Sequence, residues 1–171
     1  MTMILKRTQS KEGLQFLKSV EGSKLKAYVD VAGHLTIGVG HKLTAQELKT
    51  KVIVVKGKAI SWSNGISQED VDDLLDQDTN YFEKVINVHI KTQLSQNQFD
   101  ALVSFVFNVG ASAFLSSTLL RKINAQLLHH VPGELLKWNK ITDPQTKKKV
   151  MSRGLSNRRT KEINLWLGQY S

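Results

Sequence analysis

The feature that most constrains the fold is an uncharged run from Ala101 to Leu120. A run of this length could span a bilayer as a helix. It contains, however, several residues that suit a turn or a polar contact better: Ser104, Asn108, Gly110, Ser112, Ser116, Ser117 and Thr118. Gly110 also falls where a helix begun at Ser95 should end. We therefore expect two buried helices that meet at a turn and form the core of a mostly helical lobe.

Helix-start signals recur along the rest of the chain. Ser10 is placed to cap a helix that runs to Glu21. Capping boxes or near variants follow at 44–47, 67–70 and 95–98, and further helices are expected over 117–126, 132–138 and 156–167. Strand patterns are confined to 26–41 and 52–60. The chain is thus expected to be α+β, with an N-terminal lobe at about 10–66, a connecting helix at about 67–89 and a helical lobe at about 93–171.

The positive charge is concentrated near the C-terminus. Residues 1–120 carry 13 Lys+Arg against 12 Asp+Glu, and residues 121–171 carry 11 against 3, so the last third holds +8 of the net +9. Such a segment suits a polyanion: nucleic acid, an anionic wall polymer or a lipid surface. No helix-turn-helix or aromatic stacking platform is evident, which argues against nucleic acid. The chain has no cysteine and no metal-ligand spacing, so neither a metal nor a cofactor is expected.

The stretch AYVDVAGHLTIGVGHKL, residues 27–43, reads as a short β-hairpin. Its second strand would place Leu35, Ile37 and Val39 on one face and Thr36, Gly38 and Gly40 on the other. Because the second face is nearly bare, we expect a ligand to approach the backbone there. His41, which closes the hairpin, is expected to be a structural hydrogen-bonding group rather than a catalyst.

Two carboxylates flank this hairpin. Glu21 shares the apolar stripe of Leu14 and Leu17 and stands at a helix C-terminus, where burial and the helix dipole both favour the protonated acid. Asp30 lies at the mouth of the turn that precedes Thr36. Alone, each has an ordinary structural interpretation: a fraying glutamate, a turn-starting aspartate and a strand threonine. Together, an acid and a base across a gap are what the hydrolysis of a glycosidic bond requires.

The run EGSKLKAYVDVAGHLTIGVGHKLT, from Glu21 to Thr44, resembles the signature of the phage-type lysozymes, the endolysins of glycoside hydrolase family 24. The pattern E-x8-D-x5-T is met by Glu21, Asp30 and Thr36. Three later segments also resemble the family: SQNQFDALVSFVFNVG, the region of Trp138, and GLSNRRTKE.

The resemblance implies a lysozyme-like fold of one catalytic domain over 1–171, with a cleft between lobes. It implies a muramidase that cuts the β-1,4 bond between N-acetylmuramic acid and N-acetylglucosamine in peptidoglycan and so lyses the host cell. By carry-over, Glu21 protonates the leaving oxygen while Asp30 and Thr36 hold the attacking water. The substrate contacts expected from the bare face and the resemblance are Gly38, Gly40, Phe107 and Thr118, with core packing the alternative for Phe107 and capping for Thr118.

Several expectations on reaction and location accompany this interpretation. A lytic transglycosylase is the closest alternative, and Asp30 and Thr36 favour hydrolysis over it. The apolar run from Met3 to Leu5 is too short for a signal peptide, so the protein is expected to be made in the host cytoplasm and to reach the periplasmic wall through a holin-type lesion. We expect a monomer that binds glycan strands. We also expect its basic C-terminal segment to bind an anionic outer-membrane surface.

Overall fold

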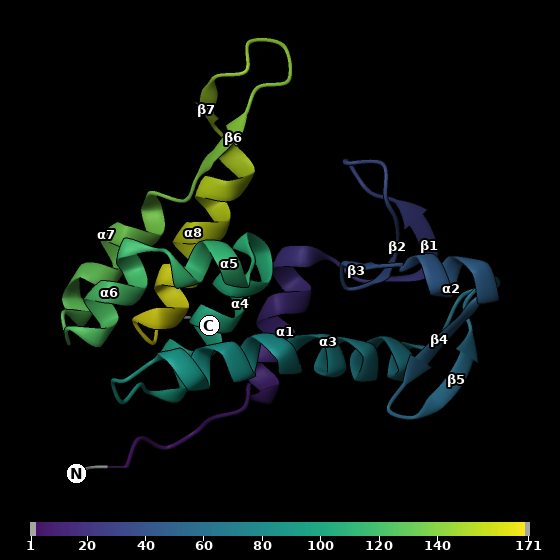
Figure 1. Cartoon of the computed structure of the whole chain (residues 1–171), viewed down its shortest axis with the longest axis horizontal. Coiled ribbons are helices and arrows are strands. Elements are labelled where there is room, and N and C mark those ends of the chain that lie inside the picture. Colours follow the sequence, from purple (N-terminus) through teal and green to yellow (C-terminus); the bar gives the residue numbers. More distant parts are fainter. Residues whose placement is uncertain (1–2, 170–171) are drawn as a thin grey trace. The chain divides into compact units, whose positions relative to one another are not determined.

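The computed structural model describes residues 3–169, which form two compact units (Figure 1). The sheet unit comprises residues 14–81, and the helical unit combines residues 3–13 with 82–169. Helices α1 (Lys11–Glu21) and α3 (Gln68–His89) each contribute residues to both units. Helices together with small antiparallel sheets confirm the predicted α+β class.

The sheet unit holds two separate antiparallel sheets. Strands β1 (Lys24–Val29), β2 (Leu35–Gly38) and β3 (His41–Lys42) form one, in that spatial order. The short helix α2 (Ala45–Thr50) leads to the second, the hairpin of β4 (Val52–Val55) and β5 (Lys58–Ser61). The single hairpin predicted over 26–41 is therefore wrong in one respect. The chain reverses after Gly38, which has φ +65 and is followed by a turn, and a third strand follows.

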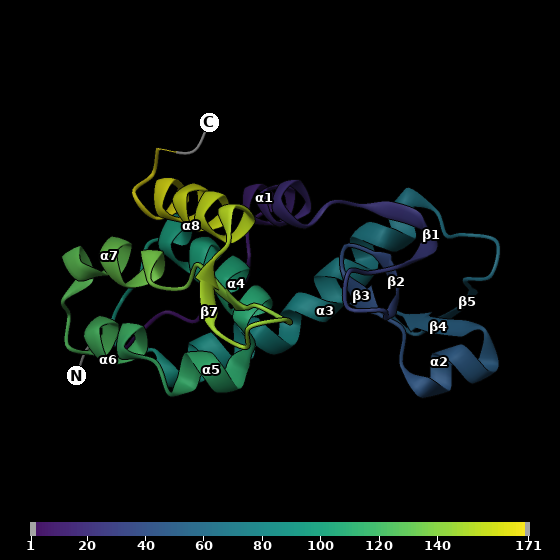
Figure 2. The ribbon, with the colours of Figure 1, turned by 90° about the horizontal axis from the view of Figure 1, so that it is seen from above.

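The core of the sheet unit forms where β2 meets α3. Val71 and Leu74, three residues apart on α3, are almost completely buried, as expected for one face of a helix. Ile37 on β2 is fully buried as well. Figure 2 shows the β1–β2–β3 strands beside the first half of α3.

The helical unit is built around α4 (Gln96–Val109), in which residues 99–106 are buried in succession. Around it are five further helical segments and one hairpin: α5 (Ala111–Leu115), α6 (Thr118–Asn124), the 3-10 turn η1 (Leu128–His130), α7 (Val131–Leu136), the strands β6 (Lys140–Thr142) and β7 (Lys149–Met151), and α8 (Arg153–Trp166). The uncharged run forms most of α4, all of α5 and the start of α6, and the chain turns at Gly110, as predicted. The prediction of two buried helices is too simple, because a third helix begins within the run and only Phe114 of α5 is buried. Among the described residues, no helix combines the length and apolarity that a membrane crossing needs.

The predicted capping residues fix several helix starts. The side chains of Thr44 and Ser95 each accept a hydrogen bond from the backbone N–H of the third helical residue. The side chain of that third residue accepts a hydrogen bond from the N–H of the cap, so both are complete capping boxes. Ser67 and Asp70 exchange the same pair of bonds at the start of α3. The capping prediction is confirmed at all three positions.

A buried ionic cluster joins α4 to α8. Glu162 is fully buried, pairs with Arg158 at 3.1 Å and with Arg159 at 3.0 Å, and accepts a hydrogen bond from Ser104 at 2.8 Å. A buried carboxylate needs such partners, since an unpaired one would be strongly destabilising. The cluster therefore fixes the position of α8 on α4 within this unit.

Candidate active site

Glu21 is the last residue of α1, as the sequence predicts. Gly22 follows with φ +79, and its N–H donates to the Lys18 carbonyl at 2.9 Å. This left-handed glycine ends the helix in the usual way and so fixes the position of the Glu21 backbone, from which the side chain extends. Leu17 on the same stripe is fully buried, whereas Glu21 itself is half-buried. The side chain of Glu21 thus lies at the edge of the core, within reach of solvent.

Asp30 is held rigidly by the turn that it opens. Its Oδ1 accepts hydrogen bonds from the N–H groups of Ala32 at 2.9 Å and His34 at 2.8 Å. These bonds, that from His34 foremost, outweigh desolvation and hold the pKa of Asp30 below its usual range. Within residues 3–169 no donor is hydrogen-bonded to Oδ2, and the Lys42 ammonium lies 3.8 Å from it. Asp30 is therefore an ionised carboxylate with one oxygen oriented and the other available to a water molecule.

Thr36 is buried, with 2% of its surface exposed. Its hydroxyl donates to the carbonyl of His34 at 3.0 Å, so the hydroxyl oxygen keeps its lone pairs to accept a further bond. On β1, Tyr28 stands directly opposite Thr36, and opposite residues in an antiparallel pair share a face.

Tyr28 connects the three predicted residues. Burial raises the pKa of the Tyr28 phenol, and the charges of Glu21 and Asp30 raise it further. Both carboxylates must therefore lie close enough to Tyr28 for their charges to act on it. Tyr28 is in the signature motif, but no role was predicted for it. The structure brings Glu21, Asp30 and Thr36 around this neutral phenol within one unit.

Gly38 does not occupy the bare, ligand-facing position predicted for it. A Cβ at Gly38 would point at Val71 and Leu74 of α3, each 3.7 Å away. The prediction assumed regular alternation along the strand, and the positive φ of Gly38 breaks it. A Cβ at this distance would make an ordinary contact, so the positive φ, and not lack of space, favours glycine at position 38. Gly40 is half-buried at φ +70 in the following turn, and its predicted substrate contact stays a prediction.

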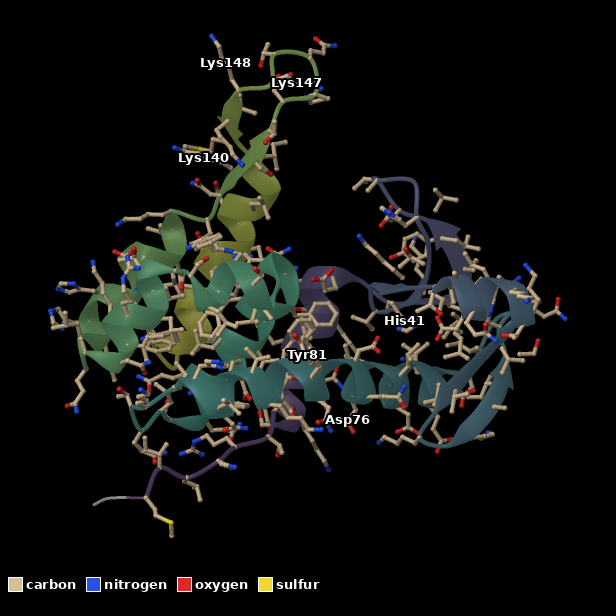
Figure 3. All side chains as sticks on the ribbon, in the orientation of Figure 1. His41, Asp76, Tyr81, Lys140, Lys147 and Lys148 are labelled. Carbon is tan, nitrogen blue, oxygen red and sulfur yellow. The ribbon has the colours of Figure 1, made fainter. Side chains whose placement is uncertain are left out.

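His41 bridges two carboxylates, which confirms its structural role (Figure 3). Its Nδ1 lies 2.7 Å from Asp78 and its Nε2 lies 3.1 Å from Glu47. Burial alone would lower the pKa of His41, but the hydrogen bonds and charges of Asp78 and Glu47 outweigh it and raise the pKa. The ring thus ties β3 to α2 and α3. No group of His, Asp and Glu side chains within residues 3–169 is arranged to hold a metal ion.

Phe107 and Thr118 belong to the helical unit. Phe107 is half-buried and packs edge-to-face on Phe82, with 5.5 Å between ring centroids. Thr118 is exposed and accepts a hydrogen bond from Arg121 at 2.9 Å. The cap of α6 is Ser117, not Thr118. Their predicted contacts with substrate stay predictions.

Comparisons with known proteins identify the family. The phage lysozyme family model matches residues 18–162. The endolysin of Salmonella phage P22 is 38% identical over 131 residues, covering 77% of this chain and 83% of that protein. The endolysin of Bacillus phage PZA is 37% identical over 159 residues, covering 92% of this chain and 54% of that protein. The solved endolysin of Escherichia coli O157:H7 phage FAHEc1 superposes with a TM-score of 0.82 at 34% identity, covering 99% of both chains.

The match includes all of Glu21, Asp30 and Thr36 and most of both units. Together with the structural likeness over nearly the whole chain, it confirms the resemblance found in the sequence. The chain belongs to the phage lysozyme family: it is an endolysin with muramidase activity, a glycoside hydrolase that acts on peptidoglycan.

Proposed function

We propose that this muramidase uses Glu21 as its general acid and Asp30, assisted by Thr36, to hold and activate the attacking water. The observation that carries the assignment is the geometry of Asp30. Two backbone N–H groups fix Oδ1, which leaves Oδ2 directed by the turn and free to accept a water proton. The Lys42 ammonium, 3.8 Å from Oδ2, favours the ionised carboxylate that this role needs.

The reaction follows from these positions. The carboxylic acid of Glu21 gives its proton to the glycosidic oxygen as the bond from that oxygen to the anomeric carbon breaks. Water forms the new bond to the anomeric carbon and loses one proton to Asp30. Its second hydrogen stays on the oxygen and is held by a hydrogen bond that the Thr36 hydroxyl oxygen accepts. Each turnover consumes one water molecule, and proton exchange with solvent restores both carboxyls. The predicted stereochemical outcome is inversion, because the nucleophile is a held water rather than the carboxylate.

Product analysis tests this proposal and separates it from transglycosylation. Purified peptidoglycan is digested, and the muropeptides are analysed by mass spectrometry and by NMR at early times. Hydrolysis adds one water and gives a reducing N-acetylmuramic acid end, first released as the inverted anomer. A 1,6-anhydro product would contradict the hydrolytic assignment, and initial release of the retained anomer would contradict the water-holding role of Asp30.

The remaining expectations on partners concern the cell envelope. We propose that the chain acts as a monomeric catalytic domain, made in the host cytoplasm and admitted to the periplasm by a holin-type lesion. The basic segment 121–171, with 11 Lys+Arg against 3 Asp+Glu, supports attraction to anionic envelope surfaces. Cosedimentation with purified outer-membrane fragments at low and high salt tests this attraction, since screening should weaken it.

A further inference from the structure

The β6–β7 hairpin is the part of the helical unit that neither the catalytic proposal nor the core explains. Strands β6 and β7 pair through Lys140–Met151, Ile141–Val150 and Thr142–Lys149. All six of these residues are exposed. The hairpin projects beyond the start of α8 (Figure 1), and the side chains of Lys147 and Lys148 extend from its tip (Figure 3).

The hairpin is held firmly despite its exposure. At the tip, Asp143 Oδ1 accepts hydrogen bonds from the N–H groups of Gln145 at 2.7 Å and Thr146 at 2.9 Å. At the base, the Ser152 N–H donates to the Asn139 carbonyl at 2.7 Å. Trp138, next to that base, packs edge-to-face on the fully buried Phe105, with 5.4 Å between centroids. These contacts define the turn at the tip and anchor the base of the hairpin on the helical unit.

The hairpin, residues 140–151, carries four lysines and one acid, Asp143. Within residues 3–169, no Asp or Glu carboxylate lies within ion-pairing distance of four lysines of the hairpin. These are Lys140, Lys147, Lys148 and Lys149. Lys147 also adopts φ +59, a conformation in which glycine would be less strained. A lysine at this position thus adds charge where the turn itself favours glycine.

Apolar side chains lie among these lysines. Met151 is 71% exposed and Ile141 is 48% exposed. At the base of the hairpin is an open hollow of about 430 Å³. It is lined by Asn108, Val109, Lys137, Trp138, Lys140, Lys149 and Leu155, a set that contains three lysines and no acid. The surface offers positive charge and exposed apolar groups side by side.

Lys140, Lys149 and Met151 share one face of the hairpin, whereas Ile141 lies on the other. We propose that the face of Lys140, Lys149 and Met151 docks on an anionic lipid layer, with the hairpin lysines on the phosphates and Met151 among the adjoining acyl chains. This inference specifies the attraction to anionic envelope surfaces that is proposed above for the basic segment, and it rests on that proposal. It does not depend on the assignment of the catalytic residues. The apolar side chains favour a lipid surface over a soluble polyanion. A dissolved phosphate polymer contacts lysines equally well but provides nothing that would bury Met151.

Vesicle cosedimentation of the full chain tests the proposal. The probes are vesicles of 30% phosphatidylglycerol in phosphatidylcholine and vesicles of phosphatidylcholine alone. Each lysine near an anionic surface contributes roughly a fivefold gain in binding, so the triple change of Lys147, Lys148 and Lys149 to Gln should lower binding about 100-fold. The matched control replaces three exposed lysines elsewhere in the helical unit, Lys84, Lys91 and Lys161, with Gln. The control removes the same charge and should lower binding far less.

Two further variants separate docking from folding and from simple charge attraction. Lys147→Gly removes one charge and relieves the left-handed strain, so binding should fall about fivefold while the melting temperature holds or rises. Met151→Thr removes no charge and should weaken vesicle binding without changing the binding of inorganic polyphosphate. Ile141→Thr, on the opposite face of the hairpin, is its matched control and should keep vesicle binding.

The outcomes are distinct. Equal losses of vesicle binding in the hairpin triple variant and its matched control would overturn the proposal, since the net charge of the protein would then explain binding. Unchanged vesicle binding by the Met151→Thr variant would also overturn it and would assign the surface to a soluble polyanion. Hydrolysis of purified wall fragments is measured in parallel. The hairpin variants should hydrolyse these fragments at the parental rate, because none of the changed residues is in the proposed catalytic group. A failure of the catalytic proposal would appear instead in variants of Glu21 and Asp30 that keep vesicle binding.

Discussion

Replacing His41 with Gln should destabilise the protein by an amount that depends on pH. The His41 ring loses hydration on burial but gains two charge-assisted contacts, to Asp78 at 2.7 Å and to Glu47 at 3.1 Å. Hydrogen bonds to charged groups contribute about 1.5–3 kcal/mol each. Because desolvation of the buried ring opposes them, we expect a net loss of about 2 kcal/mol in the free energy of unfolding at a pH of about 5.5, where the ring is protonated. For a chain of this size that loss lowers the melting temperature by roughly 4–8 °C.

The sign of the pH dependence follows from the raised pKa of His41 in the folded protein. Protonated His41 stabilises the fold in full below its unfolded pKa, about 6.5, and this contribution is lost as pH rises through the folded pKa. Urea unfolding of the parent and the His41→Gln variant between about pH 5 and 9 measures the difference. The exposed His129→Gln is the control and should change stability by less than about 0.5 kcal/mol. A difference that is constant across this range, or that grows with pH, would refute the reasoning.

Two other substitutions test separate parts of the account. Asp30→Asn keeps an oxygen that accepts the hydrogen bonds from Ala32 and His34 but cannot take a proton from water. Wall hydrolysis should therefore fall about 10²–10⁴-fold, with the melting temperature nearly unchanged. Near-parental lysis would show that Asp30 is not part of the mechanism. Gly38→Ala should lower the free energy of unfolding by about 1–2 kcal/mol because φ is +65 at this position, although the added Cβ has room at 3.7 Å from Val71 and Leu74. Thermal unfolding measures this loss. An unchanged melting temperature would show that the positive φ is not required.

Local signals explain what could be predicted from the sequence. The caps at Thr44 and Ser95 and the turn at Asp30 depend on residues two to four positions away, so the side-chain pattern is sufficient to predict them. The buried character of 101–120 was likewise predictable from its polar and glycine residues. The spacing of the family signature groups Glu21, Asp30 and Thr36 into one candidate site, because all three lie within a short stretch of chain.

The sequence-based predictions fail where contacts between distant residues or unusual backbone angles determine the local structure. The alternation used for residues 35–40 assumes extended backbone, and Gly38 departs from it with φ +65. Asp78 is 37 residues from His41, so nothing in the sequence identifies it as the partner of that ring. The β6–β7 hairpin was not predicted because each strand is short, exposed and rich in lysine, a composition that strands usually lack.

The most direct test of the central claim is the wall-lysis rate of Glu21→Gln, measured beside its melting temperature. The amide keeps the shape of the side chain at the end of α1 but cannot deliver the proton. Lysis should therefore fall about 10²–10⁴-fold or more, while the melting temperature should stay close to that of the parent because the amide keeps the shape of the side chain. Glu12→Gln, an exposed position in the first turn of the same helix, is the matched control and should keep parental lysis. A Glu21→Gln variant that lyses walls nearly as fast as the parent, or that loses activity only because it unfolds, would contradict the assignment of Glu21 as the general acid.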